Sequence, residues 1–414
     1  MKIRDENYKW IALALLCMTY FLQQGTRQIY NVTLPQIKVD FGVSDTRLGI
    51  IATAFFLVYS VVVPFAGVLA DLFRRKWMIV AGVLLFSAGI FVSGFADGLW
   101  MLFAMYGVLA AVGQCLVPTS STSLIAQLHP RTRATALSIY QASLYGGIVI
   151  CSCVSGWLAG LGPGGWRRAF WIFGAFGLVW LVALVFGLRD TPPLAKDGAQ
   201  QAEKASVREA LLATLAKPSA ILLTLGFGMC MYGSKGFFTW MPKFMGSVFP
   251  QLSPAAVAFH AVVWFYAGAL LGISLASRAS DRLAPTRAGI RMEVNILGLA
   301  LCAPCVWWVS QAPSVALCCL GLAAWGFAHG IYDSNFFASL YDVVSPRYRA
   351  AATGVFLCLG FILGAFSPTV LGWMNDNMSP RAGFASLAAF YLAGAAFILV
   401  ARLFFLKRDY VKGV

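Results

Sequence analysis

The sequence contains little charge and few acids for its length. Asp, Glu, Lys and Arg make up 11% of the 414 residues, whereas 60% are hydrophobic, which lies outside the range of soluble globular domains. The three His and ten Cys show no metal-site spacing. A Gly-rich phosphate loop is missing, which argues against ATP-driven work. Neither paired carboxylates nor a nucleophile beside a base occurs within the apolar runs, which argues against an enzyme, so we expect no cofactor and no metal.

Apolar runs long enough to cross a bilayer, about 20 residues each, recur from Trp10 onward. They predict an all-α integral membrane fold of twelve transmembrane helices in two six-helix bundles. The predicted spans of the first half are residues 10–32, 48–72, 77–95, 100–127, 134–160 and 168–188. Those of the second half are 219–245, 255–277, 288–310, 313–341, 350–374 and 382–406. The predicted domains are 1–188 and 219–414, joined by a cytoplasmic linker at 189–218.

The basic residues are distributed unevenly among the loops. If the termini are cytoplasmic, 23 of the 31 Lys and Arg lie on that side and 6 lie outside, and Arg27 and Lys235 fall within spans. This is the positive-inside bias. We therefore interpret the net charge of +15 as topology rather than nucleic-acid binding. The expected location is the cytoplasmic (inner) membrane of a bacterium, where the chain acts as a monomer with both termini cytoplasmic and the lipid bilayer as its surroundings.

Two features recur at a nearly constant offset and indicate an internal duplication. Pro130–Ala136 matches Pro346–Ala352, 216 residues later, and Asp71 matches Asp281. Duplicated membrane halves place a substrate site between them near the bilayer midplane. The sequence therefore predicts a carrier architecture with two related bundles.

Gly67–Lys76 resembles the Gly-x-Leu-x-Asp-Arg-x-Gly-Arg-Lys loop signature of the major facilitator superfamily, with departures at Leu72 and Arg74. A degraded copy stands at Ser274–Arg282. The resemblance implies the major facilitator fold, alternating access, and loop charges that latch the two halves on the cytoplasmic side. The gating residues that it implies are Asp71, Arg75, Asp281, Arg282, Arg133 and Arg349. Simple positive-inside anchoring of these residues is the alternative interpretation.

Charges inside the predicted spans are the main functional candidates, because a charge in the bilayer is costly unless it faces water or a partner. Arg27 shares a helical face with Gln23 and Asn31 at four-residue spacing. Lys235 lies in the repeat-related helix of the second half, with Tyr232 on roughly the same face. Two cations without an adjacent acid predict that an anionic substrate neutralises them.

His329 and Asp333 lie one turn apart in a predicted span of the second half. An imidazole titrates near neutrality, so this pair is a candidate carrier of a coupled proton. Alternatively, Asp333 forms an ion pair with Lys235 or Arg27 when the site is empty. Sodium is the alternative coupling ion.

Further polar residues within the spans are candidates for lining the same site. Gln114, Gln141, Tyr145 and Asn335 are the additional predicted substrate-binding residues. A lone polar residue in a bundle often makes only an interhelical hydrogen bond, which is the alternative for Gln141 in particular.

Arg27 stands eight residues before Pro35, and this segment resembles the start of organophosphate antiporters and anion:cation symporters. In those branches the Arg binds the anionic group of the substrate, and an Arg fork suits carboxylate or phosphate. Gly236–Pro242 resembles the organophosphate pattern, but Ser234 occupies its Arg position. Gln114 stands where the symporters have an acid tied to proton coupling, so a coupled proton is expected at His329 and Asp333 instead.

The predicted function is secondary transport of a small organic anion, such as a sugar acid, another carboxylate or a sugar phosphate, with proton symport. A Spinster-like carrier of amphipathic lipids is an alternative, suggested by a loose similarity of the first five spans and the 14% aromatic content. A second alternative is a membrane sensor that retains the transporter fold but only binds a sugar phosphate.

Overall fold

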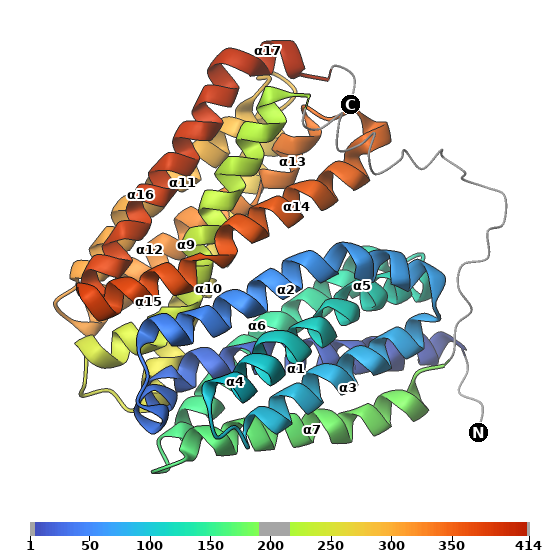
Figure 1. Cartoon of the computed structure of the whole chain (residues 1–414). Helices are drawn as coiled ribbons and strands as arrows, with labels where there is room; N and C mark the ends of the chain where they lie inside the picture. The colour runs from blue at the N-terminus through green and yellow to red at the C-terminus, as the bar shows by residue number, and fades with distance from the viewer. Residues whose placement is uncertain (1–4, 190–215, 412–414) are drawn as a thin grey trace. The chain divides into compact units, whose positions relative to one another are not determined.

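The computed structural model describes residues 5–189 and 216–411, and the elements in this part of the chain are helices and turns (Figure 1). The chain folds into two compact units. The first comprises Met1–Asp197 and Met245–Phe259, and the second comprises Gly198–Phe244 and His260–Val414. The predicted domain boundaries at residues 188 and 219 stay a prediction.

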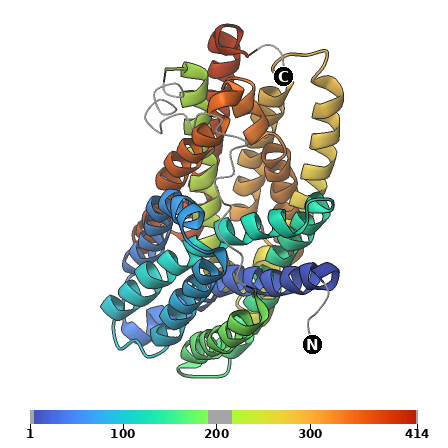
Figure 2. The same cartoon turned by 90° about the vertical axis from the view of Figure 1, so that its right-hand side faces the viewer.

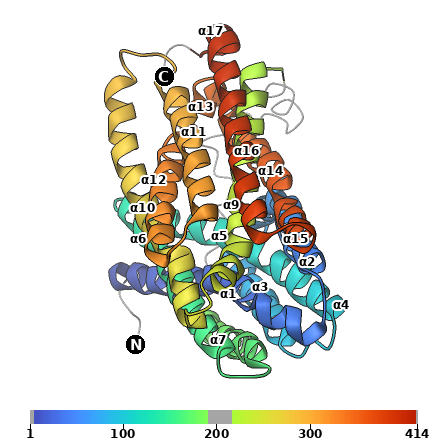
Figure 3. The same ribbon diagram turned by 90° about the vertical axis from the view of Figure 1, so that its left-hand side faces the viewer.

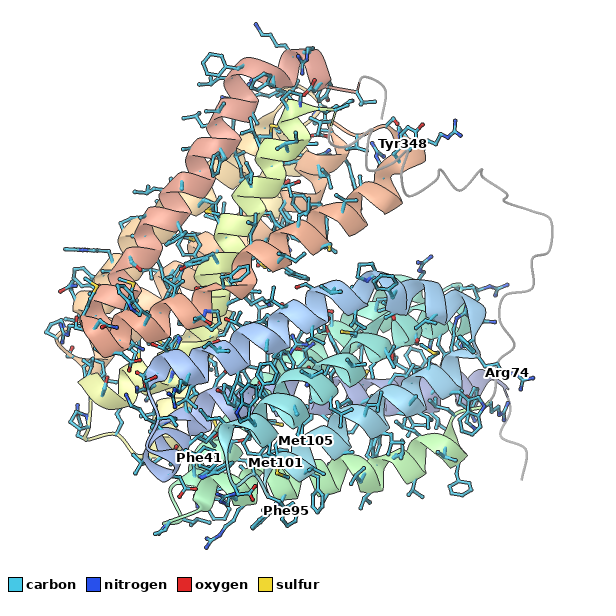
Figure 4. All side chains as sticks on the ribbon, viewed as in Figure 1. Phe41, Arg74, Phe95, Met101, Met105 and Tyr348 are labelled. Atoms are coloured by element: carbon cyan, nitrogen blue, oxygen red, sulfur yellow. The ribbon has the colours of Figure 1, made fainter. Side chains whose placement is uncertain are left out.

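The first unit is a bundle of helices from the N-terminal half. Its elements are α1 (Asp5–Phe41), α2 (Asp45–Leu72), α3 (Arg75–Ser93), α4 (Leu99–Leu102), the π-helix η1 (Phe103–Ala110), α5 (Ala111–Leu128), α6 (Arg133–Ala159) and α7 (Gly165–Gly187). Helix α1 packs most extensively on α6, while α7, drawn green in Figure 2, lies along α1 and α3. Arg74 marks one end of this bundle and Phe41 and Phe95 mark the other (Figure 4).

The second unit contains most of the remaining helices. Its elements are α9 (Pro218–Val248), α10 (Pro254–Leu283), α11 (Ile290–Gln311), α12 (Val315–Asp333), α13 (Phe336–Tyr341), the 3₁₀ turn η2 (Pro346–Tyr348), α14 (Arg349–Ala365), α15 (Ser367–Asn377), α16 (Pro380–Val400), the π-helix η3 (Ala401–Phe405) and α17 (Leu406–Asp409). The C-terminal end of α9 and the N-terminal end of α10 belong to the first unit. Helix α11 lies between α12 and α16 (Figure 3).

Eleven helical runs in the described part of the chain are long and apolar enough to span a membrane. Helix α1 is not among them, because Gln23, Gln24 and Arg27 interrupt its apolar sequence. The prediction of an all-α, multi-pass membrane protein is confirmed.

Two of the predicted spans are each found as one membrane-length run, Val315–Tyr341 and Ala352–Asn377, with a short interruption of the helix inside it. The span 313–341 divides at Ser334 and Asn335 between α12 and α13. The span 350–374 divides at Phe366, where Pro368 begins the first turn of α15 and lacks the N–H that would continue a helical hydrogen bond. The first break matters for function because it places Asp333 at the C-terminal end of α12.

Candidate functional site

Helices α1 and α6 approach closely near Arg27, because each has a glycine at the contact. A Cβ at Gly147 would lie 2.2 Å from the Phe21 carbonyl oxygen, and a Cβ at Gly25 would lie 2.2 Å from Cys151 Sγ. Small residues at helix crossings allow this backbone contact in membranes. The contact fixes the helix turn of α1 that carries Gln23 and Arg27.

Arg27 is held by α5 through Gln114. Its Nε donates to Gln114 Oε1 at 3.0 Å, and Gln23 Nε2 donates to the Gln114 backbone carbonyl at 2.6 Å. Tyr106 OH donates to the Arg27 backbone carbonyl at 3.2 Å. The structure therefore brings together three of the residues predicted to bind substrate, Gln23, Arg27 and Gln114.

Aromatic rings of α2 cover the guanidinium. The Cζ atom of Arg27 lies 5.3 Å from the Phe55 ring centroid and 4.9 Å from that of Tyr59, within cation–π distance. Tyr106 stacks on both Phe55 and Tyr30. The sequence interpretation did not include Phe55 or Tyr106 in the site, although the four-residue spacing of Phe55 and Tyr59 already predicted one aromatic face on α2.

Three polar atoms in this cluster are buried without a hydrogen-bond partner among the described residues. They are Gln23 Oε1, Arg27 Nη2 and Gln114 Nε2. The amide orientation of Gln114 is fixed, because Arg27 Nε is a donor and must face the amide oxygen. Two of the three atoms are donors, Arg27 Nη2 and Gln114 Nε2, and their hydrogens are unused. The Tyr59 hydroxyl is a further polar neighbour of the guanidinium. No Asp or Glu oxygen among the described residues lies within 4.0 Å of the guanidinium. The arrangement suits an anionic oxygen pair.

Three other residues of the first unit were predicted to bind substrate. Asn31 is buried and donates to Gln28 Oε1 at 3.1 Å on its own helix. Gln141 is exposed, and Tyr145 is half-buried. Their predicted roles stay predictions.

In the second unit, α10 and α12 interlock through two small-residue motifs. A Cβ at Gly268 would lie 2.0 Å from the Ala323 carbonyl oxygen, and one at Gly326 would lie 1.9 Å from that of Phe265. Gly272 and Gly330 repeat the pattern one turn later. This Gly-x-x-x-Gly packing on both helices fixes the position of His329, which precedes Gly330.

His329 is almost fully buried and makes polar contacts on both ring nitrogens. Its Nδ1 lies 3.1 Å from Asp333 Oδ2, where the aspartate side chain is 32% exposed. Its Nε2 lies 2.8 Å from Ser234 Oγ and 3.5 Å from Cys230 Sγ, both on α9. The Phe265 ring of α10 packs edge-on at 5.4 Å. Within the described chain, the ion pair of Asp333 is therefore with His329.

The line of Asp333, His329 and Ser234 has the connectivity of a hydrolase triad, so the expectation that no hydroxyl stands beside a base was wrong. Sequence reasoning missed it because 95 positions separate Ser234 from His329. Ser234 lies in the middle of α9, where its backbone N–H belongs to the helix and cannot form an oxyanion hole. The three residues can hold and move a proton.

The other predicted residues of the second unit surround these helices. Lys235 is half-buried, and its Nζ lies 5.1 Å from the Phe361 ring centroid. Tyr232 stacks on Phe390 at 3.8 Å. Asn335 is buried and donates to Ser334 Oγ at 2.7 Å. Their substrate contacts stay predictions.

The predicted gating residues lie at helix ends. Arg75 is buried, at 2% exposure, and its Nη1 donates to Gln127 Oε1 on α5. Arg349 donates to the Tyr341 backbone carbonyl at 3.0 Å. Arg133, Asp281 and Arg282 are exposed, and the side chain of Asp71 lies outside the described residues. A gating role stays a prediction for all six.

Comparison with known proteins identifies the family. The family model of the Major Facilitator Superfamily matches residues 16–368 and 250–413. The chain belongs to the Major Facilitator Superfamily. Among its relatives in the superfamily, an MFS-type efflux pump of Mycolicibacterium smegmatis is 26% identical and covers 94% of this chain and 90% of its own length. A probable sulfoacetate transporter, SauU, of Cupriavidus necator is 23% identical over 91% of this chain and 89% of its own.

Solved structures show the same superfamily fold. The crystal structure of a bacterial homologue of the human lysosomal transporter Spinster, inward-facing and unoccupied, matches with a TM-score of 0.86 at 22% identity. The match covers 98% of this chain and 99% of the other. The superfamily relatives are transporters rather than enzymes, which confirms the predicted family, fold and non-enzymatic function.

Proposed function

We propose that this protein is a secondary transporter of a small organic anion, working by alternating access and coupled to protons. The observation that carries the proposal is the pair of buried, unused donors at Arg27 Nη2 and Gln114 Nε2. Leaving a buried donor unpaired costs roughly 1–3 kcal/mol, and more when it is charged. A bound carboxylate, sulfonate or phosphate oxygen pair would satisfy both donors at once.

The surroundings of Arg27 support an anion as well. A guanidinium that is paired with an acid gains little from a second anion, but the neighbours of Arg27 are an amide, a phenol hydroxyl and two aromatic rings, none of which is an acid. The positive charge is therefore available to a ligand. The name of the relative SauU, a probable sulfoacetate transporter, gives one example of such a substrate in the superfamily.

Proton coupling is assigned to His329 and Asp333. They are adjacent, and the imidazole is buried while the carboxylate is one-third exposed. Such a pair can hold a proton on the buried ring beside a carboxylate that reaches water. This assignment is tested separately from the anion site.

A two-step experiment tests the anion site. Purified protein is first screened by thermal shift against sugar acids, sulfonates, dicarboxylates and sugar phosphates at two pH values, and uptake of the best ligand is then measured in proteoliposomes. We expect Arg27→Ala to lower uptake by about tenfold to a hundredfold, because a lost charge-assisted hydrogen bond costs roughly 1.5–3 kcal/mol. The matched control Arg47→Ala, an exposed Arg in the same unit, retains uptake. Normal uptake of every anion by Arg27→Ala would refute the site.

A Spinster-like carrier of amphipathic lipids is the second candidate, supported by the similarity to the Spinster homologue and by the aromatic rings around Arg27. Including lysolipids in the same screen separates the two. Stabilisation by lysolipids alone favours the lipid carrier. Binding without flux in proteoliposomes favours a sensor.

We also propose that the chain lies in a bacterial cytoplasmic membrane as a monomer, with both termini in the cytoplasm. The excess of Lys and Arg in alternate loops supports this orientation. Reporter fusions that are active only in the cytoplasm, placed at either terminus, should be active. Activity of a reporter that requires export would reverse the assignment.

A further inference from the structure

Asp333, His329 and Ser234 form one continuous hydrogen-bonded line in the second unit. Asp333 Oδ2 lies 3.1 Å from Nδ1 of the imidazole, and Ser234 Oγ lies 2.8 Å from Nε2. Ser234 and His329 are buried, at 5% and 6% exposure. Water therefore has little access to the Nε2 end of the ring, and Ser234 is its main polar neighbour.

The Ser234 hydroxyl has a single hydrogen, and its polar neighbours include the Tyr391 hydroxyl of α16, which can donate to it as well as accept from it. Two other neighbours decide its orientation relative to the imidazole. One is the backbone carbonyl of Cys230, one helical turn earlier, at 3.0 Å, and the other is Nε2 of His329. A hydroxyl can donate one hydrogen bond and accept others. When it donates to Cys230, its lone pair is free to accept from Nε2–H. When it turns toward Nε2, it donates to a bare ring nitrogen.

These two positions match the two protonation states of His329. With the imidazolium, Nδ1–H bonds the Asp333 carboxylate and Nε2–H bonds Ser234, so the pair is neutral overall. In the neutral ring, Nδ1–H still bonds Asp333, Nε2 is bare, and the rotated Ser234 hydroxyl donates to it. The pair then carries one negative charge. Both states keep every hydrogen bond of the ring, which is important where unpaired polar groups are costly.

We infer that Ser234 is a rotating hydroxyl that serves both protonation states of His329, so that Nε2 is protonated in the charged ring and bare in the neutral ring. Asp333 then acts as the group that orients the ring and holds Nδ1–H. Ser234 is thus a positioning residue for the proton step. The inference rests on the proposed proton coupling at His329.

The other groups facing this ring leave Ser234 as its principal Nε2 partner. On α9, Cys230 Sγ lies 3.5 Å from Nε2, but a thiol is only a weak donor and acceptor. On α10 the facing group is the apolar ring of Phe265. On α12, Tyr332 presents its ring at 6.5 Å. The hydroxyl of Tyr391 on α16 contacts Ser234 rather than the ring, beside Gly233, where an added Cβ would lie 2.6 Å from that hydroxyl.

Nitrogen NMR of the His side chains in lipid nanodiscs tests the inference directly. The chain has three His, and the His329→Gln variant identifies which signals belong to His329. In the wild type, we expect Nδ1 to stay protonated across the titration while Nε2 alone changes state. In Ser234→Ala, the midpoint moves to lower pH by about 0.5 to 1 unit, because the charged ring loses a stronger hydrogen bond than the neutral ring does.

Two further variants control for structure. Ser234→Thr keeps a hydroxyl and should restore the wild-type midpoint. Thr224→Val removes a hydroxyl that bonds the carbonyl four residues earlier on the same helix but has no imidazole partner, so the midpoint should not move. If Ser234→Ala does not fold, the wild-type titration still decides which ring nitrogen changes state.

Three results would overturn the inference: an unchanged midpoint in Ser234→Ala, titration at Nδ1, or a shift of equal size in Thr224→Val. Failure of the proposed coupling looks different. In that case a proton gradient would not drive wild-type uptake in proteoliposomes. The NMR titration would still show which nitrogen of His329 changes state and whether Ser234 shifts the midpoint.

Discussion

Gly326 on α12 lies so close to Phe265 on α10 that a Cβ on the glycine would stand 1.9 Å from the phenylalanine carbonyl oxygen. The neighbour is backbone, which cannot rotate away as a flexible side chain would. The close approach therefore depends on glycine, and the buried end of the proposed proton site depends on the close approach, since His329 extends from the same interlocked turns.

Gly326→Ala should destabilise the protein strongly. The added methyl must push α10 and α12 apart, and overpacking of this kind typically costs about 1–3 kcal/mol. The matched control is Gly354→Ala in α14, where an added Cβ has nothing within 4 Å and alanine favours the helix by up to about 1 kcal/mol. Thermal unfolding in detergent, followed by Trp fluorescence, should show a lowered midpoint for Gly326→Ala alone. Equal midpoints for both variants would contradict the backbone contact.

Gln114→Glu should weaken substrate binding more than it weakens folding. A carboxylate at this position accepts from Arg27 Nε and also neutralises the guanidinium, so a substrate anion loses its electrostatic advantage. We expect the concentration for half-maximal uptake to rise by about tenfold or more, with a normal unfolding midpoint. Gln251→Glu is the control, because Gln251 is an exposed residue of the same unit and no site role is predicted for it. If both variants raise that concentration equally, Gln114 has no special role.

His329→Gln and Asp333→Asn should uncouple transport from the proton gradient. Removing either partner breaks the charge pair that holds the proton on the buried ring, because neither an amide nor an imidazole beside an amide reproduces it. Gradient-driven accumulation should fall to the passive level, while exchange of labelled for unlabelled substrate continues. Measuring both activities in the same vesicles separates coupling from folding. Accumulation at the wild-type level in both variants would place the proton elsewhere.

The repeated helical spans and the polar residues within them were predictable from the sequence, because hydropathy and helical spacing are local properties. Arg27 with Gln23, and His329 with Asp333, each share one helix face. The partners that complete the sites were not predictable, because Gln114 is 87 positions from Arg27 and Ser234 is 95 from His329. Only the tertiary packing of α5 beside α1 and of α9 beside α12 brings them together.

One residue that the sequence interpretation missed, Arg291, could have been found from the internal duplication. The offset of 216 that relates Arg133 to Arg349 also relates Arg75 to Arg291. In the structure, both members of the second pair stand at the start of a helix and bind the end of a neighbouring helix. Arg75 bonds Gln127, and Arg291 Nη1 lies 2.6 Å from Asp342 Oδ1. The duplication is therefore visible in contacts as well as in sequence.

Arg291→Ala should lower stability in a pH-dependent way. Burial raises the pKa of the Asp342 carboxyl above its usual value, and Arg291 opposes that rise. Without the arginine, the folded-state pKa of Asp342 rises further above the unfolded value. Folding then favours the protonated acid, so the penalty appears as pH increases above the unfolded value of about 4. We expect the unfolding midpoint to fall by a few degrees at pH 8, from a loss of about 1–2 kcal/mol.

At pH 5 the same variant should be closer to the wild type, because more of its Asp342 is protonated and needs no counter-charge. Asp342→Asn, which removes the titrating group but keeps a polar side chain, should show no such recovery on acidification when combined with Arg291→Ala. Unfolding midpoints of the four proteins measured at both pH values test this. A deficit in Arg291→Ala that is independent of pH would mean that the arginine acts through packing alone. The charge of Arg291 would then not stabilise the Asp342 carboxylate.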